Sequence, residues 1–211
     1  MLKIVKIERQ KNNKERFNIY FDNKEIIGVS LYILHKYKLN LNKNLSEKDI
    51  EKIVKEENLE LCKQKAFDLI SRRPQSKKEL EKKLNSFLYR RIKSKNLKQA
   101  LIKKTFKILE KYNYLNDEKF AQWIVNQRKA QLKGPLYIKK DLLIKGISNK
   151  IIQDVLSNTN FKKELKKSFI KTNEKLRNEK NIYTKKNKIY AYLLRQGFYP
   201  EDINNIIEKV K

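Results

Sequence analysis

The sequence predicts a mainly α-helical protein built from tandem three-helix repeats, with a small β-hairpin or meander at its N-terminus. Three observations predict this class. Apolar residues recur at helical spacing through most of the chain, all four glycines fall at predicted turns or helix ends, and the stretch around Gly146 aligns with the stretch around Gly197. Because such repeats bury their apolar faces only by stacking, we expect an elongated, curved rod.

Four regions follow from this pattern. We expect a β-meander with a short helix over residues 1–45, and a first helical repeat with a lead-in helix over 46–115. A second, central repeat is expected over 116–158 and a third over 159–211. No apolar run approaches the ~20 residues of a membrane span. The N-terminus lacks the apolar core of a signal peptide, and the single cysteine has no partner for an internal disulfide. These features favour a cytoplasmic protein.

The N-terminal region alternates with the period of a β-strand. Phe17, Ile19 and Phe21 share one face, and a polar turn separates them from a third apolar run at 25–29. This spacing predicts a three-stranded meander that packs on a helix over 31–37. His35, the only histidine, has no second His or Cys nearby, so we interpret it as a surface or packing residue.

Residues 46–70 have the pattern of one long helix. Ser46 is a candidate N-cap with Asp49 in the first turn, and Asn58 is a candidate break. Cys62 falls on the apolar side, where we expect it to be buried and inert because no motif pairs it with a histidine or aspartate.

Pro74 marks the end of that helix, and Ser76 with Glu79 predicts a capping box for the next one. That next helix places three leucines on one face. The leucines are Leu80, Leu84 and Leu88. A third helix is expected from about Leu97 to Lys111, with its apolar positions at Ala100, Leu101, Thr105, Ile108 and Leu109.

The central repeat has the clearest punctuation. Asn116 is a candidate N-cap, Gly134 precedes a proline at the first helical position, Gly146 is expected at a left-handed C′ position, and Ser148 caps the next helix. The residues expected to face inward are Phe120, Trp123, Ile124 and Gln127.

The pattern returns from Phe161. A long first helix is expected to carry Leu165, Phe169, Ile170 and Leu176. A second helix is expected to begin at Thr184 and end at Gly197. A third is expected to begin at Pro200 and to carry Ile203, Ile206, Ile207 and Val210.

Aligning Gly146 with Gly197 places apolar residues on apolar residues. Ile138 falls on Ile189, and Leu142 on Leu193. Ser76 takes the place of Gly134 in the first copy. That copy has no glycine between Ser86 and Lys95, so its second helix is extended or a loop is inserted there.

The net charge of +28 favours a polyanionic partner, most commonly nucleic acid. Alternatively, part of the positive charge reflects a genome of low G+C content, which enriches Lys, Asn and Ile. Tyrosines at 89, 112, 114 and 137 interleave the basic clusters. Arginine, which binds phosphate or carboxylate through two hydrogen bonds, is scarce beside lysine. The candidate binding residues are Arg72, Arg73, Lys77, Lys78, Lys82, Lys83, Arg90, Arg91, Arg128, Lys133, Lys139, Lys140 and Lys145.

The sequence offers no pattern typical of catalysis. No glycine belongs to a phosphate-binding loop, and no metal-ligand set or activated nucleophile is recognisable. Asp117 and Glu118 are paired acids, but they open a helix and suit its dipole. We therefore expect a binding protein without catalytic residues, cofactor or metal.

Three motifs, in order and spacing, resemble the RecX family, bacterial regulators of the RecA recombinase. The residues that carry the resemblance are Arg72-Arg73-Pro74-Gln75-Ser76-x-x-Glu79-Leu80-x-x-x-Leu84, then Tyr114-Leu115-Asn116-Asp117-Glu118-x-Phe120-Ala121, then Arg128 and Lys133-Gly134-Pro135-x-x-Ile138-x-x-Asp141-Leu142-x-x-Lys145-Gly146-Ile147. The match is close over residues 63–156 and weaker beyond. The N-terminal meander is similar to the extension of longer RecX proteins, whereas the altered turn of the first copy departs from the family.

The resemblance implies three tandem three-helix repeats and no enzyme activity. It implies a monomer that binds the RecA filament, restrains strand exchange, ATP hydrolysis and coprotease activity, and in some members binds single- or double-stranded DNA. Two alternatives stay open: a sequence-independent DNA- or RNA-binding protein, and a scaffold that binds an acidic protein.

Overall fold

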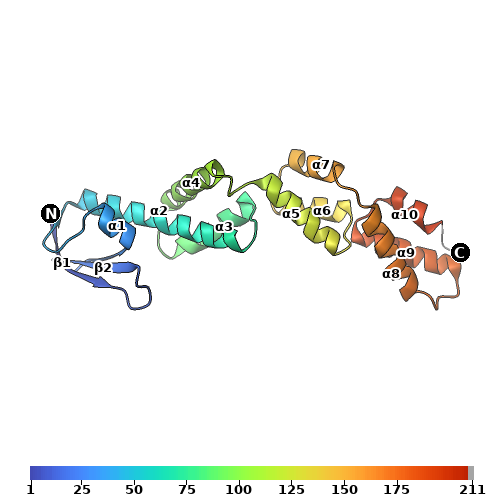
Figure 1. Ribbon diagram of the computed structural model, residues 1–211, viewed down its shortest axis with the longest axis horizontal. Helices are drawn as coiled ribbons and strands as arrows, with labels where there is room; N and C mark the ends of the chain where they lie inside the picture. Colours follow the sequence, from blue (N-terminus) through green and yellow to red (C-terminus); the bar gives the residue numbers. More distant parts are fainter. Residues whose placement is uncertain (209–211) are drawn as a thin grey trace. The chain divides into compact units, whose positions relative to one another are not determined.

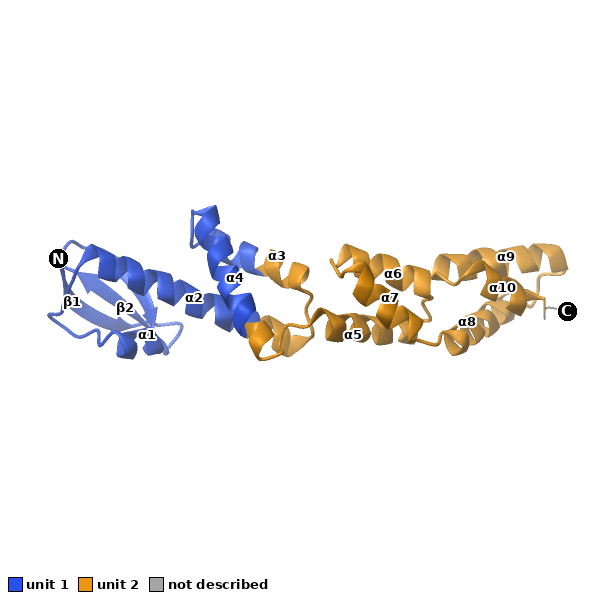
Figure 2. Cartoon of the chain, turned by 90° about the horizontal axis from the view of Figure 1, so that it is seen from above, with its two compact units in different colours: residues 1–68, 84–108 blue, residues 69–83, 109–211 orange. Residues whose placement is uncertain are grey.

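The computed structural model describes residues 1–208, and Val210, expected at the end of the third repeat, lies outside them. The chain divides into two compact units (Figure 2). Unit 1 holds Met1–Asp68 and Leu84–Ile108; unit 2 holds Leu69–Lys83 and the chain from Leu109 onward. The predicted class, mainly helical with a small N-terminal sheet, is confirmed.

Unit 1 begins with a four-stranded antiparallel sheet in the order β3-β2-β1-β4. The strands are β1 (Leu2–Arg9), β2 (Arg16–Phe21), β3 (Ile26–Ser30) and β4 (Asn44–Leu45). The three predicted strands are present, and the fourth is a correction. β4 pairs with the start of β1 over only two residues, Leu45 opposite Leu2 and Asn44 opposite Lys3. Two residues are too few to show alternation, so the sequence pattern missed it.

The sheet packs on α1 (Leu31–Lys36) and on the N-terminal part of α2 (Glu47–Arg72), as Figure 1 shows. Ile19 and Phe21 of β2 are buried against Ile33 of α1 and Ile53 of α2. The predicted packing on the 31–37 helix is therefore confirmed, and α2 adds a second surface that covers the core.

A buried carboxylate fastens α2 to the sheet. Glu57, 3% exposed, accepts hydrogen bonds from Arg16 Nη1 at 2.7 Å and from the backbone N–H and hydroxyl of Ser30 at 2.8 and 2.9 Å. These bonds use both carboxylate oxygens, which compensates for removing the charge from water.

The long helix α2 forms as predicted in most respects. Ser46 and Asp49 cap each other reciprocally, with the Asp49 N–H donating to the Ser46 hydroxyl at 3.1 Å. The break expected near Asn58 is wrong, because α2 is continuous and the Asn58 side chain donates back to the Val54 carbonyl at 2.9 Å. Cys62 is fully buried, and burial raises the pKa of its thiol.

The altered turn of the first copy is resolved as a helix extension. α3 (Lys77–Tyr89) has 13 residues where α6 (Pro135–Ile144) has 10, and Leu80, Leu84 and Leu88 are all fully buried on it. The added turn keeps Leu88 in the core, so lengthening the helix gains buried apolar area.

α4 (Lys95–Lys111) begins two residues earlier than expected, with the Ser94 hydroxyl accepting a hydrogen bond from the Leu97 N–H at 3.3 Å. Its buried face is also rotated slightly from the prediction. Ala100 is exposed, whereas Ile102 is buried beside Leu101.

The helices of the second copy, α5 (Asp117–Ala130), α6 and α7 (Asn149–Ser157), share one core. The predicted caps are confirmed: the Asn116 side chain accepts from two N–H groups of α5, and Ser148 accepts from the Ile151 N–H. Gly146 has a φ of 81° in the left-handed region. Gln127 was expected to face inward but is exposed; Val125 is buried instead.

The third copy, α8 (Lys162–Lys175), α9 (Ile182–Gln196) and α10 (Pro200–Ile207), has a core of its own. Gly197 ends α9 with a φ of 89°, as predicted. One expectation is wrong: α9 begins at Ile182, because Asn181 rather than a residue near Thr184 caps it. Ile170 of α8 is 42% exposed.

Candidate binding surfaces

The capping residue of α3 lies against the end of α6. Ser76 accepts from the Glu79 N–H at 3.1 Å and donates its hydroxyl to the Lys145 carbonyl at 2.8 Å. The predicted capping box is only half formed, because the Glu79 carboxylate accepts from Lys145 at 2.7 Å and from Arg73 at 3.0 Å instead of returning to Ser76. Burial raises the pKa of Glu79, but the hydrogen bonds and positive charges of Lys145 and Arg73 together outweigh it and hold the pKa below its ordinary value.

Further ion pairs extend this contact within unit 2. Arg128 donates to Asp141 at 2.7 Å, and the Arg73 guanidinium lies 5.6 Å from the centre of the Trp123 ring. Lys77 is 2.8 Å from Glu110. Several of the predicted binding residues are thus engaged by the protein itself. Arg73, Lys133 and Lys145 contact another copy, whereas Lys77 and Arg128 form ion pairs within their own copy.

The same contact recurs one copy later. The Gly134 N–H donates to the Gln196 carbonyl at 2.8 Å, and the Leu136 N–H donates to the Gly197 carbonyl at 2.9 Å. Gly134 and Gln196 occupy the aligned places of Ser76 and Lys145. We call these two contacts between copies the joints: Ser76 with Lys145 is the first, and residues 134–136 with 196–197 are the second. In both joints, the N-terminus of one copy's second helix forms hydrogen bonds with the C-terminal end of the next copy's second helix.

Two further candidate residues also form hydrogen bonds within the protein. Lys78 donates to the Ile144 carbonyl at 3.1 Å and Lys83 to the Gln75 side chain at 2.9 Å. Arg72, Lys82, Arg90, Arg91, Lys139 and Lys140 are exposed.

The first copy carries more basic residues than the sequence motifs indicate. The chain has no Asp or Glu between Glu81 and Glu110, and we call residues 82–109 the acid-free segment. Six of its lysines were missed, although the gap between the two glutamates signals them. They are Lys93, Lys95, Lys98, Lys103, Lys104 and Lys107.

Aromatic rings accompany the cations of the acid-free segment within unit 1. Tyr89 is 74% exposed and lies 5.0 Å from Lys98 Nζ, measured to the ring centre. The Arg91 guanidinium lies 4.4 Å from the centre of the Phe87 ring. Flat rings beside cations provide the two elements that contact single-stranded nucleic acid: stacking faces and positive charge.

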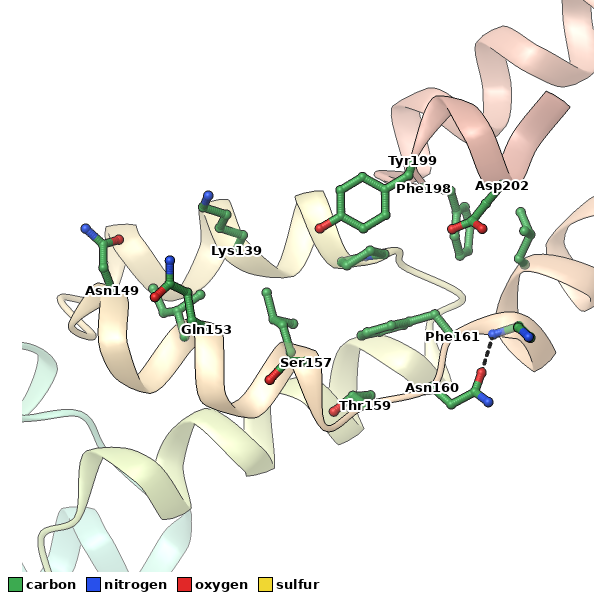
Figure 3. A pocket seen from close by; sticks show the side chains of 15 residues that line it. Lys139, Asn149, Gln153, Ser157, Thr159, Asn160, Phe161, Phe198, Tyr199 and Asp202 are labelled. Atoms are coloured by element: carbon green, nitrogen blue, oxygen red, sulfur yellow. Dashed lines mark hydrogen bonds between the residues drawn. The ribbon is translucent and has the colours of Figure 1, made fainter. Parts of the chain in front are cut away.

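A pocket of about 730 Å³ opens between the second and third copies in unit 2. Figure 3 shows Asn149, Gln153 and Ser157 following one another along α7, with Lys139 on α6 and Tyr199 at the start of α10. The lining is mixed polar and apolar. No group of three or more metal-ligating His, Cys, Asp or Glu side chains lies among residues 1–208. Within the same residues, no helix is long and apolar enough to span a bilayer.

Comparison with known proteins identifies the family. The model of the RecX N-terminal domain matches residues 2–46, and that of the second three-helix domain of RecX matches residues 116–156. Regulatory protein RecX of Bacillus licheniformis is 33% identical over 198 residues, covering 92% of this chain and 72% of that protein. The chain belongs to the RecX family. Regulatory protein RecX of Clostridium beijerinckii is 30% identical and covers 100% of the chain and 96% of its own length.

Solved RecX structures are similar in fold. A crystal structure of regulatory protein RecX superimposes with a TM-score of 0.70 at 25% identity, covering 99% of both chains. The crystal structure of RecX from Lactobacillus salivarius superimposes with a TM-score of 0.60 at 29% identity, covering 72% of this chain and 96% of that one. The name of these relatives is that of a regulatory protein.

Proposed function

We propose that this RecX family member binds the RecA–DNA filament and lowers its strand exchange, ATP hydrolysis and coprotease activities. It acts as a monomer in the cytoplasm and uses no cofactor. Membership of the RecX family supports the choice of partner. The charge supports the nucleic-acid part of the target, because a chain of net charge +28 is attracted to a polyanion.

The observation that carries the proposal is the acid-free segment. Its exposed cations, among them Arg90, Lys103, Lys104 and Lys107, lie where no neighbouring carboxylate in the sequence offsets them. Several cations on one helix neutralise several phosphates together and release their counterions, so this surface favours a nucleic-acid filament. The cations of the joints, by contrast, are already engaged by the protein itself.

The test is a titration of the DNA-dependent ATPase of the cognate RecA, with DNA saturating, at two salt concentrations. We expect substoichiometric protein to lower the ATPase rate at both. Inhibition that disappears at the higher salt would mean polyanion attraction alone, and no inhibition at either would contradict the proposal.

The second candidate function is sequence-independent DNA or RNA binding without RecA. The exposed Tyr89 with Arg90 and Arg91 favours it, because a base can stack on the ring while the guanidinium groups contact phosphate. The two candidates differ in one measurement: after nuclease treatment, only a RecA regulator retains binding to the cognate RecA.

A further inference from the structure

A groove of about 490 Å³ lies between α6 and the C-terminal end of α9, both in unit 2. Four of the side chains that line it are large, apolar and exposed. Their exposed fractions are 38% for Leu136, 38% for Tyr137, 64% for Ile144 and 43% for Leu194.

The core of the copy does not account for these side chains. Ile138 and Leu142 of α6 are fully buried, so the helix already has its inward face. Leu136 and Ile144 are eight positions apart, slightly more than two helical turns, and both line the groove. Clustered apolar side chains in contact with water mark a surface that another molecule covers.

The charges around the groove are positive. Lys140 and Arg195 line it, and Lys133 Nζ lies 4.6 Å from the centre of the Tyr137 ring. The carboxylate in the lining, Asp141, is engaged by Arg128 at 2.7 Å and lies 4.0 Å from Lys145. An occupant therefore meets cations that carry no matching acid in the groove.

The walls are held together by the backbone. The Leu136 N–H donates to the Gly197 carbonyl at 2.9 Å, and an added methyl at Gly197 would lie 2.4 Å from the Tyr137 nitrogen. Since nothing larger than glycine fits at this contact, α6 and α9 present a groove of fixed width. A preformed groove costs an incoming segment less ordering free energy.

We propose that this groove docks a segment of a partner protein that carries large apolar side chains flanked by carboxylates. The apolar side chains fill the floor, and the carboxylates pair with Lys140 and Arg195. Nucleic acid fits poorly, because the floor is mostly aliphatic and offers a single ring, Tyr137, on which a base could stack. The inference rests on the proposed function for the identity of the partner, which is then a protein surface of the filament, but not for the chemistry of the groove.

The first measurement is fluorescence anisotropy of a labelled synthetic peptide of leucine and glutamate, titrated with the full chain. A peptide of equal length made of leucine and lysine is the charge control. The test variant combines Ile144→Ser with Leu194→Ser. The matched control combines Ile170→Ser with Ile182→Ser, which are 42% and 54% exposed in the same unit. Circular dichroism checks that both variants are folded.

We expect the leucine–glutamate peptide to bind the wild type and the control variant, and the groove variant to lose about tenfold or more in affinity. The leucine–lysine peptide is expected not to bind. If the leucine–glutamate peptide does not bind, or if the groove variant binds it as tightly as the wild type does, the proposal that this groove docks a partner segment is overturned.

A second measurement separates the groove from its partner. Binding of the chain to cognate RecA on oligothymidylate is compared with binding to oligothymidylate alone. We expect the groove variant to weaken only the first. If the wild type ignores RecA while the peptide result holds, the proposed function fails and the groove docks another acidic protein.

Discussion

At the scale of single residues, the cations of this chain are of two kinds: some are paired with a carboxylate of the protein, and others are exposed in a stretch without acids. Lys145 and Arg73 both bond the carboxylate of Glu79, and Arg128 bonds Asp141. Lys145, through Glu79, and Arg73, which also lies 5.6 Å from the centre of the Trp123 ring, join the first copy to the second, whereas Arg128 joins α5 to α6 within the second copy. Exposed cations such as Lys103 and Lys104 lie in a stretch of sequence that contains no acid. The same residue type therefore stabilises the fold in one place and is available to a partner in another.

Glu57 should be the most costly single carboxylate to remove from unit 1. Glu57→Ala leaves Arg16 and the Ser30 N–H without their buried partner, so we expect the free energy of unfolding to fall by about 3 kcal/mol in urea denaturation. The control is Glu60→Ala on the same helix, where Glu60 forms an ion pair with Lys63 one turn away; it should cost under about 1 kcal/mol. Equal effects would contradict the anchoring role of Glu57.

Glu79 should make stability depend on pH. Its pKa lies below the ordinary 4.5 because Lys145 and Arg73 outweigh the effect of burial. A depressed pKa contributes stability above the unfolded value, and that stability is lost as pH falls through the lower folded value. We expect the difference in Tm between wild type and Glu79→Gln to be largest near neutral pH and to shrink below about pH 4.5. A difference that stays constant down to strongly acidic pH would argue against this ion pair.

At the scale of helices, both joints of unit 2 connect the second helices of successive copies, but they use different hydrogen-bond donors. The first uses the Ser76 hydroxyl on the Lys145 carbonyl, surrounded by ion pairs. The second uses the Gly134 backbone N–H on the Gln196 carbonyl. A side chain donor reaches across a gap, whereas a backbone donor requires that the two chains approach closely. The second joint therefore depends on glycine.

Gly134→Ala tests that dependence. A methyl group at Gly134 would lie 2.4 Å from the Gly197 carbonyl oxygen and 2.6 Å from the Phe198 nitrogen, both backbone atoms that cannot rotate away. We expect a loss of about 3 kcal/mol in the free energy of unfolding. Gly28→Ala is the control, since the nearest neighbours of its methyl group would be the flexible ends of side chains, Gln10 at 3.1 Å, Arg16 at 3.5 Å and Asn18 at 3.9 Å, and it should be nearly neutral. Comparable losses for the two variants would contradict a close-packed joint.

At the scale of the whole molecule, the net charge of +28 is distributed unevenly along the chain. The acid-free segment concentrates cations in the first copy, whereas the apolar groove lies between the second and third. Nucleic acid and the partner protein are therefore proposed to bind different copies. A tandem repeat permits this, because each copy keeps its core while its exposed residues vary.

The uneven charge predicts which lysines matter for nucleic acid. Replacing Lys103, Lys104 and Lys107 by alanine should weaken oligonucleotide binding and reduce the slope of log K against log salt by about 0.7 for each phosphate that the variant no longer neutralises. The matched variant replaces Lys166, Lys167 and Lys171 of α8, which are also exposed. Both remove three charges, so equal effects would mean that net charge alone governs binding.

The sequence by itself determined where most helices begin and end. Caps such as Ser46 and Ser148 and the left-handed turns at Gly146 and Gly197 act over a few residues, so their signals are complete in the local sequence. The fold class and the family resemblance followed from these signals and from their repetition.

Only the tertiary structure decided which candidate binding residues are engaged. Lys145 is 66 positions from Glu79, and Lys133 is 63 from Gln196, distances over which no local pattern pairs side chains. The same holds for β4, which exists because β1 lies beside it, and for the groove, which forms only where α6 meets α9. Helix caps depend on local geometry, whereas ion pairs and grooves depend on which distant segments the packed copies bring together.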